Sequence, residues 1–180
     1  MSALSALVVL VPEAEPHVAG LRQRFDASAR LGVSAHITIL APFMPPERID
    51  HRVLEQIAAA FARVPAFPFQ IFEVCRFVAT TYLAPVPADP FIRLTESVAS
   101  VFPDYPPFSG QHSTIVPHLT VAHGDAPHAS VAADELSGIM KRQGAINAYC
   151  SSVVLLQNAS GLWQQMGQFP LCQPGIPHTV

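Results

Sequence analysis

The sequence predicts an α+β fold in which two lobes of one compact domain share a cleft. Strand-length apolar runs alternate with helical patterns along the 180 residues. A four-residue pattern, His-apolar-Thr-apolar, occurs at residues 36–39 and again at residues 118–121. Half of the residues are hydrophobic and only 13% are charged, so a substantial core can form. We therefore expect a single domain over residues 1–180, made of two repeats of about 1–79 and 80–180.

The first repeat begins with a continuous apolar run that predicts a buried strand. Val18, Leu21 and Phe25 then recur at helical spacing, and Pro16 suits the first turn of that helix. A second helical pattern follows the first motif and starts at Pro45. The elements expected here are strand 6–11, helix 16–29, strand 36–39, helix 45–61 and strand 67–78.

The second repeat follows the same order of elements. Two helical patterns carry apolar residues three and four positions apart, at residues 91–101 and 131–140. The segment 158–161 reads Asn-Ala-Ser-Gly, which is typical of a hairpin turn. The strands expected here cover residues 81–86, 118–121, 149–157 and 162–171.

The surroundings of the two motifs support an internal duplication. Pro12 and Pro87 each end a strand, and Pro45 and Pro127 each lie nine residues after the motif histidine. The second copy carries about seven extra residues, which the loop 103–110 accounts for.

The motifs place a histidine and a threonine on the same face of each strand. Side chains two residues apart point to one side of a sheet, so His36 and Thr38 share a face, and so do His118 and Thr120. The intervening apolar residues are directed into the core. Two such strands near each other would frame a small anionic group.

Composition narrows the partners and the cellular compartment. The net charge is −3 and Lys141 is the single lysine, which argues against an extended nucleic-acid tract as partner. Three cysteines with no Cys-x-x-Cys spacing fit a cytoplasmic protein. The apolar N-terminal stretch is too short to cross a bilayer, so we expect no membrane association. We expect a monomer, although no sequence feature reports the oligomeric state.

The paired motifs resemble those of the two-histidine phosphoesterases, which include 2′-5′ RNA ligase-like proteins and cyclic phosphodiesterases. Both motifs match in full, and the flanking segments 41–43 and 116–117 also look like the family. The resemblance implies a bilobal, pseudo-twofold fold with two antiparallel-rich sheets, flanking helices and both motifs in a central cleft. It also implies cofactor-free, metal-independent hydrolysis of 2′,3′-cyclic phosphates of nucleotides or RNA ends.

The motif residues suit this chemistry on their own. Opening a cyclic phosphodiester requires a base to deprotonate water and an acid to protonate the leaving alkoxide. An imidazole serves either role near neutral pH, so His36 and His118 are the candidate catalytic pair. The hydroxyls of Thr38 and Thr120 are candidate phosphate contacts, because they can donate to the non-bridging oxygens. Which histidine is the acid cannot be read from the sequence.

Further substrate contacts are expected from residues outside the motifs. His123 is a candidate, although a regular strand would put it on the face opposite to His118, and the resembled family often has arginine or an aromatic residue nearby. Aromatic side chains can stack on a base, and core packing is the alternative for each of them. The aromatic candidates are Phe43, Tyr82 and Trp163, and the candidate phosphate-contacting cations are Arg76 and Arg93.

Three other functions remain open. A metallohydrolase would draw on His36, His118, His123 and His112, but no carboxylate has a convincing ligand spacing. A binding module for nucleotides or RNA ends would keep the phosphate site without turnover. RNA 2′-5′ ligation would need a larger RNA partner, which the shortage of lysine and arginine disfavours.

Overall fold

In the computed structural model, which describes residues 3–110 and 114–173, eight strands form one antiparallel sheet. The strand order is β6-β3-β4-β5-β2-β1-β7-β8. The strands are β1 (Ser5–Leu10), β2 (His36–Leu40), β3 (Phe67–Phe77), β4 (Thr80–Val86), β5 (Leu119–His123), β6 (Ile146–Cys150), β7 (Ser152–Gln157) and β8 (Gln164–Pro170).

The α+β class is confirmed, but the expectation of two separate sheets is wrong. The two motif strands β2 and β5 are neighbours, and the pairing of Ile37 with Leu119 joins two four-stranded halves into one sheet. Hydrophobic periodicity predicts where strands lie but carries no information about their partners. The two motifs therefore lie side by side at the centre of the sheet.

The sheet curls, so that its two ends approach each other. The chain passes from β6, at one edge, to β7, next to the other edge, across the single residue Ser151. Pro65, before β3, also forms a bridge with Cys172, after β8. The prediction of one strand over residues 149–157 is wrong for this reason: the segment changes partners at Ser151, where the sequence has no proline or glycine to mark a break.

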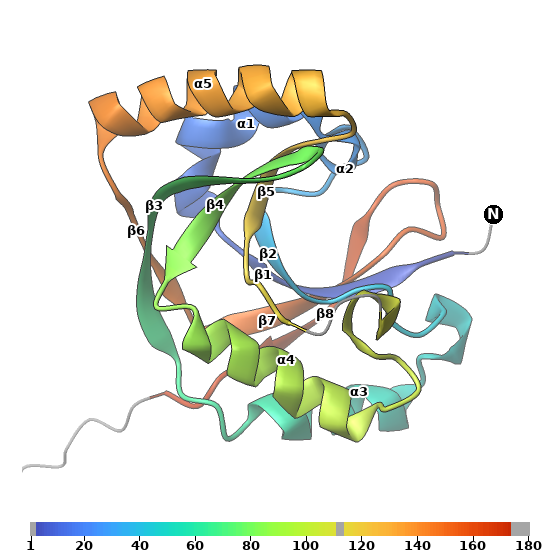
Figure 1. The fold of residues 1–180 in the computed structure, drawn as a ribbon. Coiled ribbons are helices and arrows are strands. Elements are labelled where there is room, and N and C mark those ends of the chain that lie inside the picture. Colours follow the sequence, from blue (N-terminus) through green and yellow to red (C-terminus); the bar gives the residue numbers. More distant parts are fainter. Residues whose placement is uncertain (1–2, 111–113, 174–180) are drawn as a thin grey trace, which may run out of the picture.

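The helices pack at two places on the curled sheet (Figure 1). Helices α1 (Glu15–Phe25) and α5 (Ala126–Gln143) lie together, and α3 (His51–Phe61) and α4 (Asp89–Val101) lie together on the far side of the strands. The short helix α2 (Ala27–Arg30) follows α1. Among the described residues, none of the helices has both the length and the apolar character needed to cross a membrane.

Two predicted helices have different limits in the structure, because aspartates cap them. The helix expected over residues 16–29 breaks at Asp26, whose backbone is extended and whose side chain accepts the Ser28 N–H. The helix expected from Pro45 begins at His51, since Asp50 accepts the Val53 N–H at 2.9 Å. Residues before Asp50 form only a 3₁₀ turn, Pro46–Arg48.

One large hydrophobic cluster runs through both halves of the sheet and both helical pairs. Phe91 of α4 is fully buried and meets the rings of Phe67 and Phe69 edge-on, at centroid distances of 5.0 Å each. A smaller cluster lies on β1 and β7 and includes Val8 and Val154. The repeat boundary near residue 79 stays a prediction: β7 and β8 continue the half that contains β1 and β2, whereas β3 and β6 belong to the other.

Candidate active site

His36 stands at the start of β2 on the face opposite to the large core. Ile37 and Ile39 are buried, so alternation turns His36 and Thr38 to the other side of the sheet. The Nδ1 atom of His36 lies 2.8 Å from the carbonyl oxygen of Ser34. A carbonyl only accepts hydrogen bonds, so Nδ1 carries the hydrogen and Nε2 is the basic nitrogen of the neutral ring.

His118 repeats this arrangement at the second motif. It immediately precedes β5, and its Nδ1 atom lies 2.7 Å from the carbonyl oxygen of Val116. In both copies the histidine therefore donates to the backbone two residues earlier. This contact fixes the tautomer and the ring orientation, and it leaves Nε2 available for proton transfer.

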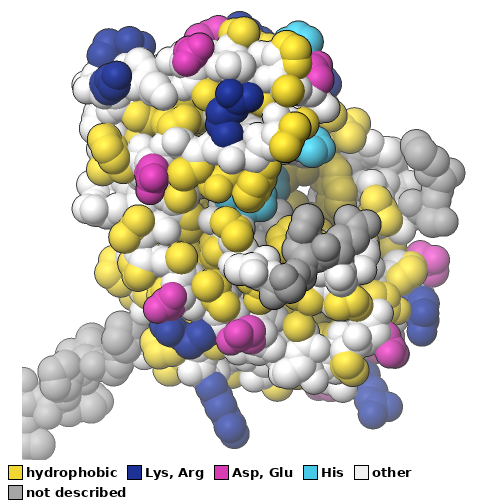
Figure 2. Space-filling view, viewed as in Figure 1, with side chains coloured by type: hydrophobic (Ala, Val, Ile, Leu, Met, Phe, Trp, Pro, Cys, Tyr) yellow, Lys and Arg dark blue, Asp and Glu magenta, His cyan; other side chains and the backbone are white. Residues whose placement is uncertain are grey.

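Both histidines line one cavity of about 780 Å³. Figure 2 shows histidine side chains in and beside a hollow at the centre of this face, bordered by hydrophobic side chains. The described residues that line the cavity are Asp26, Ser28, His36, Phe77, Thr80, Phe108, Thr114, Val116, His118, Thr120 and His123. A cavity of this size suits a nucleotide-sized molecule.

Of the two motif threonines, only Thr120 is among the described residues that line this cavity. Thr38 shares the face of His36 but pairs with Val8, which belongs to the smaller hydrophobic cluster. The two motifs therefore differ in where they present their hydroxyl groups.

A bulge in β5 brings His123 into the cavity. Thr81 pairs with Ala122 but Tyr82 pairs with Thr120, so Val121 is an extra residue on β5. The extra residue reverses the alternation, which puts His123 on the face of Thr120. The expectation that a regular strand would turn His123 to the opposite face is therefore not met. The Nδ1 atom of His123 lies 2.8 Å from the hydroxyl oxygen of Thr80.

Two aromatic rings support His118. Phe77 and Tyr82 are stacked with a centroid distance of 4.5 Å, and His118 lies 5.5 Å from the first ring and 5.2 Å from the second. Tyr82 is buried, whereas Phe77 is 42% exposed and lines the cavity. Phe77 is therefore the ring of this pair that a bound molecule can reach. The sequence alone does not single out Phe77, because it ends a long strand and its position near His118 depends on tertiary pairing.

The remaining candidates lie away from the cavity lining. Phe43 is buried and packs edge-on against Phe102 and Tyr105, so core packing is its role in the structure. Trp163 packs against the smaller hydrophobic cluster. The two arginines are exposed: Arg76 donates to Ser130 and to the carbonyl of Ala126 in α5, and Arg93 lies on α4.

Burial keeps both motif histidines neutral. It lowers the pKa of His36 from 6.5 to about 4, and the charge of Arg22 acts in the same direction, as does His118 when that ring is protonated. The Ser34 carbonyl and the Asp26 carboxylate favour the charged ring of His36 but do not outweigh burial. Burial also lowers the pKa of His118, with a smaller contribution from His123. A phosphate in the cavity would favour the charged form of either ring.

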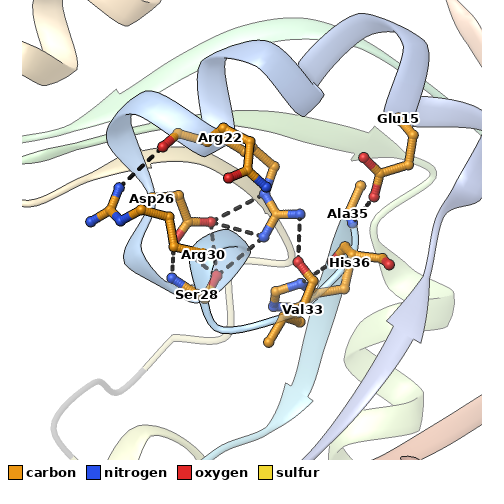
Figure 3. A network of polar contacts seen from close by, with 10 residues as sticks. Glu15, Arg22, Asp26, Ser28, Arg30, Val33, Ala35 and His36 are labelled. Carbon is orange, nitrogen blue, oxygen red and sulfur yellow. Dashed lines mark hydrogen bonds and ion pairs between the residues drawn. The ribbon is translucent and has the colours of Figure 1, made fainter. Parts of the chain in front are cut away.

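A buried polar network lies directly behind His36 (Figure 3). Arg22 donates to Asp26 at 2.9 Å and to the hydroxyl of Ser28 at 3.1 Å, and both of these partners line the cavity. None of these three residues is expected from the sequence patterns described above. The available sequence signal is Asp26 two positions before Ser28, a pairing typical of a helix cap.

The described part of the chain contains no cluster of side chains suited to binding a metal ion. Within residues 3–110 and 114–173, no group of three or more His, Cys, Asp or Glu side chains could hold an ion. His112, the fourth histidine considered for such a site, lies outside the described residues.

Comparisons with known proteins agree with this fold. Among solved structures, the chain is similar to the *Escherichia coli* LigT complex with 3′-AMP, with a TM-score of 0.60 and 12% identity over 96% of this chain and 100% of LigT. TT0787 of *Thermus thermophilus* gives a TM-score of 0.63 with 14% identity over 97% of this chain and 100% of that protein. No curated protein matches the sequence significantly. The family model of the 2′-5′ RNA ligase superfamily matches residues 10–162. The chain therefore belongs to the 2′-5′ RNA ligase superfamily, the two-histidine phosphoesterases.

Proposed function

We propose that the protein is a metal-independent phosphodiesterase that opens 2′,3′-cyclic phosphates of nucleotides or RNA ends. The observation that carries this proposal is the matched anchoring of His36 and His118, whose Nδ1 atoms meet backbone carbonyls at 2.8 and 2.7 Å in one shared cavity. Each ring then offers Nε2 for one of the two proton transfers that ring opening requires.

The reaction needs one base, one acid and hydrogen-bond donors to the phosphate. One histidine takes a proton from water as the water oxygen bonds to phosphorus. The other gives a proton to the 2′ or 3′ oxygen as its bond to phosphorus breaks. Thr120, which lines the cavity, donates to a non-bridging oxygen, where negative charge increases in the transition state. Thr38 is not among the described residues that line the cavity, so its hydroxyl is the weaker candidate for this role.

The proposed substrate is a nucleotide or a molecule of similar size that carries an aromatic base. Phe77, partly exposed in the cavity, offers a ring face on which a base can stack. *E. coli* LigT has been crystallised with 3′-AMP and with ATP, and we carry nucleotide binding over to this chain as part of the proposal. His123, whose Nδ1 atom contacts the Thr80 hydroxyl, also lines the cavity and is a further candidate contact for the phosphate or the sugar.

The direct test is turnover of nucleoside 2′,3′-cyclic phosphates, and of RNA ending in one, with excess chelator. We expect a single phosphomonoester product, and its 2′ or 3′ position identifies the leaving oxygen. His51→Gln, on the exposed side of α3, is a matched control and should retain full activity.

Three outcomes would contradict the proposal. Tight binding of the product 3′-AMP without turnover of any cyclic phosphate would make the protein a binding module. Joining of a 5′-hydroxyl RNA to the cyclic end, faster than hydrolysis, would make it a ligase. Activity that the chelator abolishes would overturn the metal-independent mechanism.

A further inference from the structure

Arg22 is an unusual residue for a protein core. It is 1% exposed, and with Asp26 it forms a buried ion pair on consecutive turns of the chain. Burying such a pair typically loses several kcal/mol of solvation per ion, and an apolar pair of similar volume is often at least as stable. Arg22 and Asp26 are the two buried charged side chains in the described part of the chain. The position of this pair therefore calls for an explanation other than stability.

Arg22 holds the backbone that leads into the first motif. One arm of its guanidinium donates to the carbonyl of Val33 at 3.0 Å, while the other arm and Nε bind Asp26. The next carbonyl, that of Ser34, accepts the Nδ1 hydrogen of His36. Figure 3 shows Arg22 reaching from α1 to this segment, with His36 immediately beyond it.

The same segment is fixed on its other side. The N–H of Ala35 donates to the carboxylate of Glu15, and the carbonyl of Ala35 accepts the Val11 N–H at 2.8 Å. The residues before His36 therefore have little freedom to rotate. Among the described residues, the second motif has no comparable buried cation, and His118 packs instead against Phe77 and Tyr82.

We infer that Arg22 is a positioning residue for His36: by fixing the Val33–Ser34 backbone, it maintains the Nδ1–H tautomer and keeps Nε2 available to the cavity. Arg22 is not among the described residues that line the cavity, so it acts through the backbone. Through Asp26 and Ser28 it also shapes one wall of the cavity. The consequence for catalysis rests on the proposed function, whereas the consequence for the tautomer does not.

The test compares Arg22→Lys with wild type by ¹⁵N NMR of the histidine rings in the ligand-free protein. Lysine retains the charge beside Asp26, so the variant should fold, but it lacks the planar fork that reaches both Asp26 and the Val33 carbonyl. We expect wild-type His36 to show one tautomer and the variant a mixture, with His118 unchanged. A thermal unfolding curve confirms that the variant is folded.

The kinetic arm separates positioning from a merely structural role. With a cyclic phosphate, Arg22→Lys should lower kcat by about 10- to 100-fold while KM changes less than about twofold, because the error is in the orientation of a catalytic group. Arg24→Lys is the matched control on the same helix, since Arg24 is exposed and pairs with Glu135. It should leave kcat, KM and the His36 tautomer unchanged.

A folded Arg22→Lys protein with the wild-type His36 tautomer would overturn the inference, whatever its activity. If the wild type turns over no cyclic phosphate, the proposed function fails. The NMR comparison then still decides whether Arg22 positions His36, because it requires no substrate.

Discussion

His36 and His118 differ in their electrostatic surroundings although their backbone contacts match. The charged groups that act on His36 include Arg22 and Asp26, whereas His123 is the neighbour that contributes to lowering the pKa of His118. Burial lowers the pKa of both rings, to about 4 for His36. At pH 7 both are therefore mostly neutral in the free protein, and one must bind a proton before it can act as the acid.

The pH dependence of kcat/KM follows from these shifts. The reaction needs one neutral and one protonated histidine, so kcat/KM should follow a bell-shaped curve whichever ring is the acid. Because both pKa values lie below 6.5, the maximum should lie on the acid side of pH 6.5. Initial rates at low substrate between pH 4 and 9 measure this directly. A maximum above pH 7.5 would contradict the expected order of protonation.

The two motif threonines should not be equivalent. Thr120 lines the cavity but Thr38 packs beside Val8, so Thr120→Val should lower kcat more than Thr38→Val does. Losing one donor to a charged transition state typically reduces the rate by about 10²–10³-fold. Steady-state kinetics of the two matched variants check this, and a larger loss for Thr38→Val would reverse the assignment.

At the scale of the element, strands and helices were predictable, but their partners and interruptions were not. The motif strands could be predicted because alternation of apolar residues reports burial on one face. The bulge at Val121 could not, since it depends on how β4 and β5 align and no residue type marks it. That one irregularity decides whether His123 reaches the cavity. Phe77 was missed for a related reason, as its contact with His118 arises between strands distant in sequence.

Removing the aspartate that caps α3 should affect stability without affecting catalysis. Asp50→Ala removes the acceptor for the Val53 N–H at the start of α3, and Asp50 is not among the described residues that line the cavity. It should lower the free energy of unfolding by about 1 kcal/mol. Denaturant unfolding measures this loss, and cyclic phosphate turnover should be unchanged. A loss of turnover at full stability would show that α3 affects the site.

The large hydrophobic cluster connects both halves of the curled sheet, so the molecule should unfold as one unit. The sequence predicted a single domain from its apolar content. Its expectation of two sheets failed because the pairing of β2 with β5 is a long-range contact. The residues of the candidate site were easier to predict than the pairing of the strands, because each motif contains its own histidine and threonine. The contacts of Arg22 behind His36 could not be predicted, because they depend on a buried ion pair.

Acid should destabilise the whole molecule through its buried histidines. A histidine with a pKa of 6.5 when unfolded and about 4 when folded binds more protons in the unfolded chain. Its contribution to stability is therefore complete above pH 6.5 and is lost as the pH falls toward 4. Between pH 7.5 and pH 5, His36 should account for a loss of roughly 2 kcal/mol in the free energy of unfolding.

Denaturant unfolding at several pH values, with His36→Gln beside wild type, measures that contribution. The variant should show a shallower pH dependence by about this amount, and His118→Gln should act in the same direction. His51→Gln, at an exposed position, should match the wild type. An identical pH dependence for His36→Gln and wild type would mean that His36 is not held neutral by the fold.

In the proposed mechanism, His36 and His118 act together on one phosphodiester without a metal. This cooperation can be measured as kcat for a nucleoside 2′,3′-cyclic phosphate, in excess chelator, for His36→Gln, His118→Gln and the double variant. Each single substitution should lower kcat by about 10²–10⁴-fold. The double variant should be little slower than the slower single variant, because acid and base work as a unit. If either single variant retained the wild-type kcat, the two-histidine account would be contradicted.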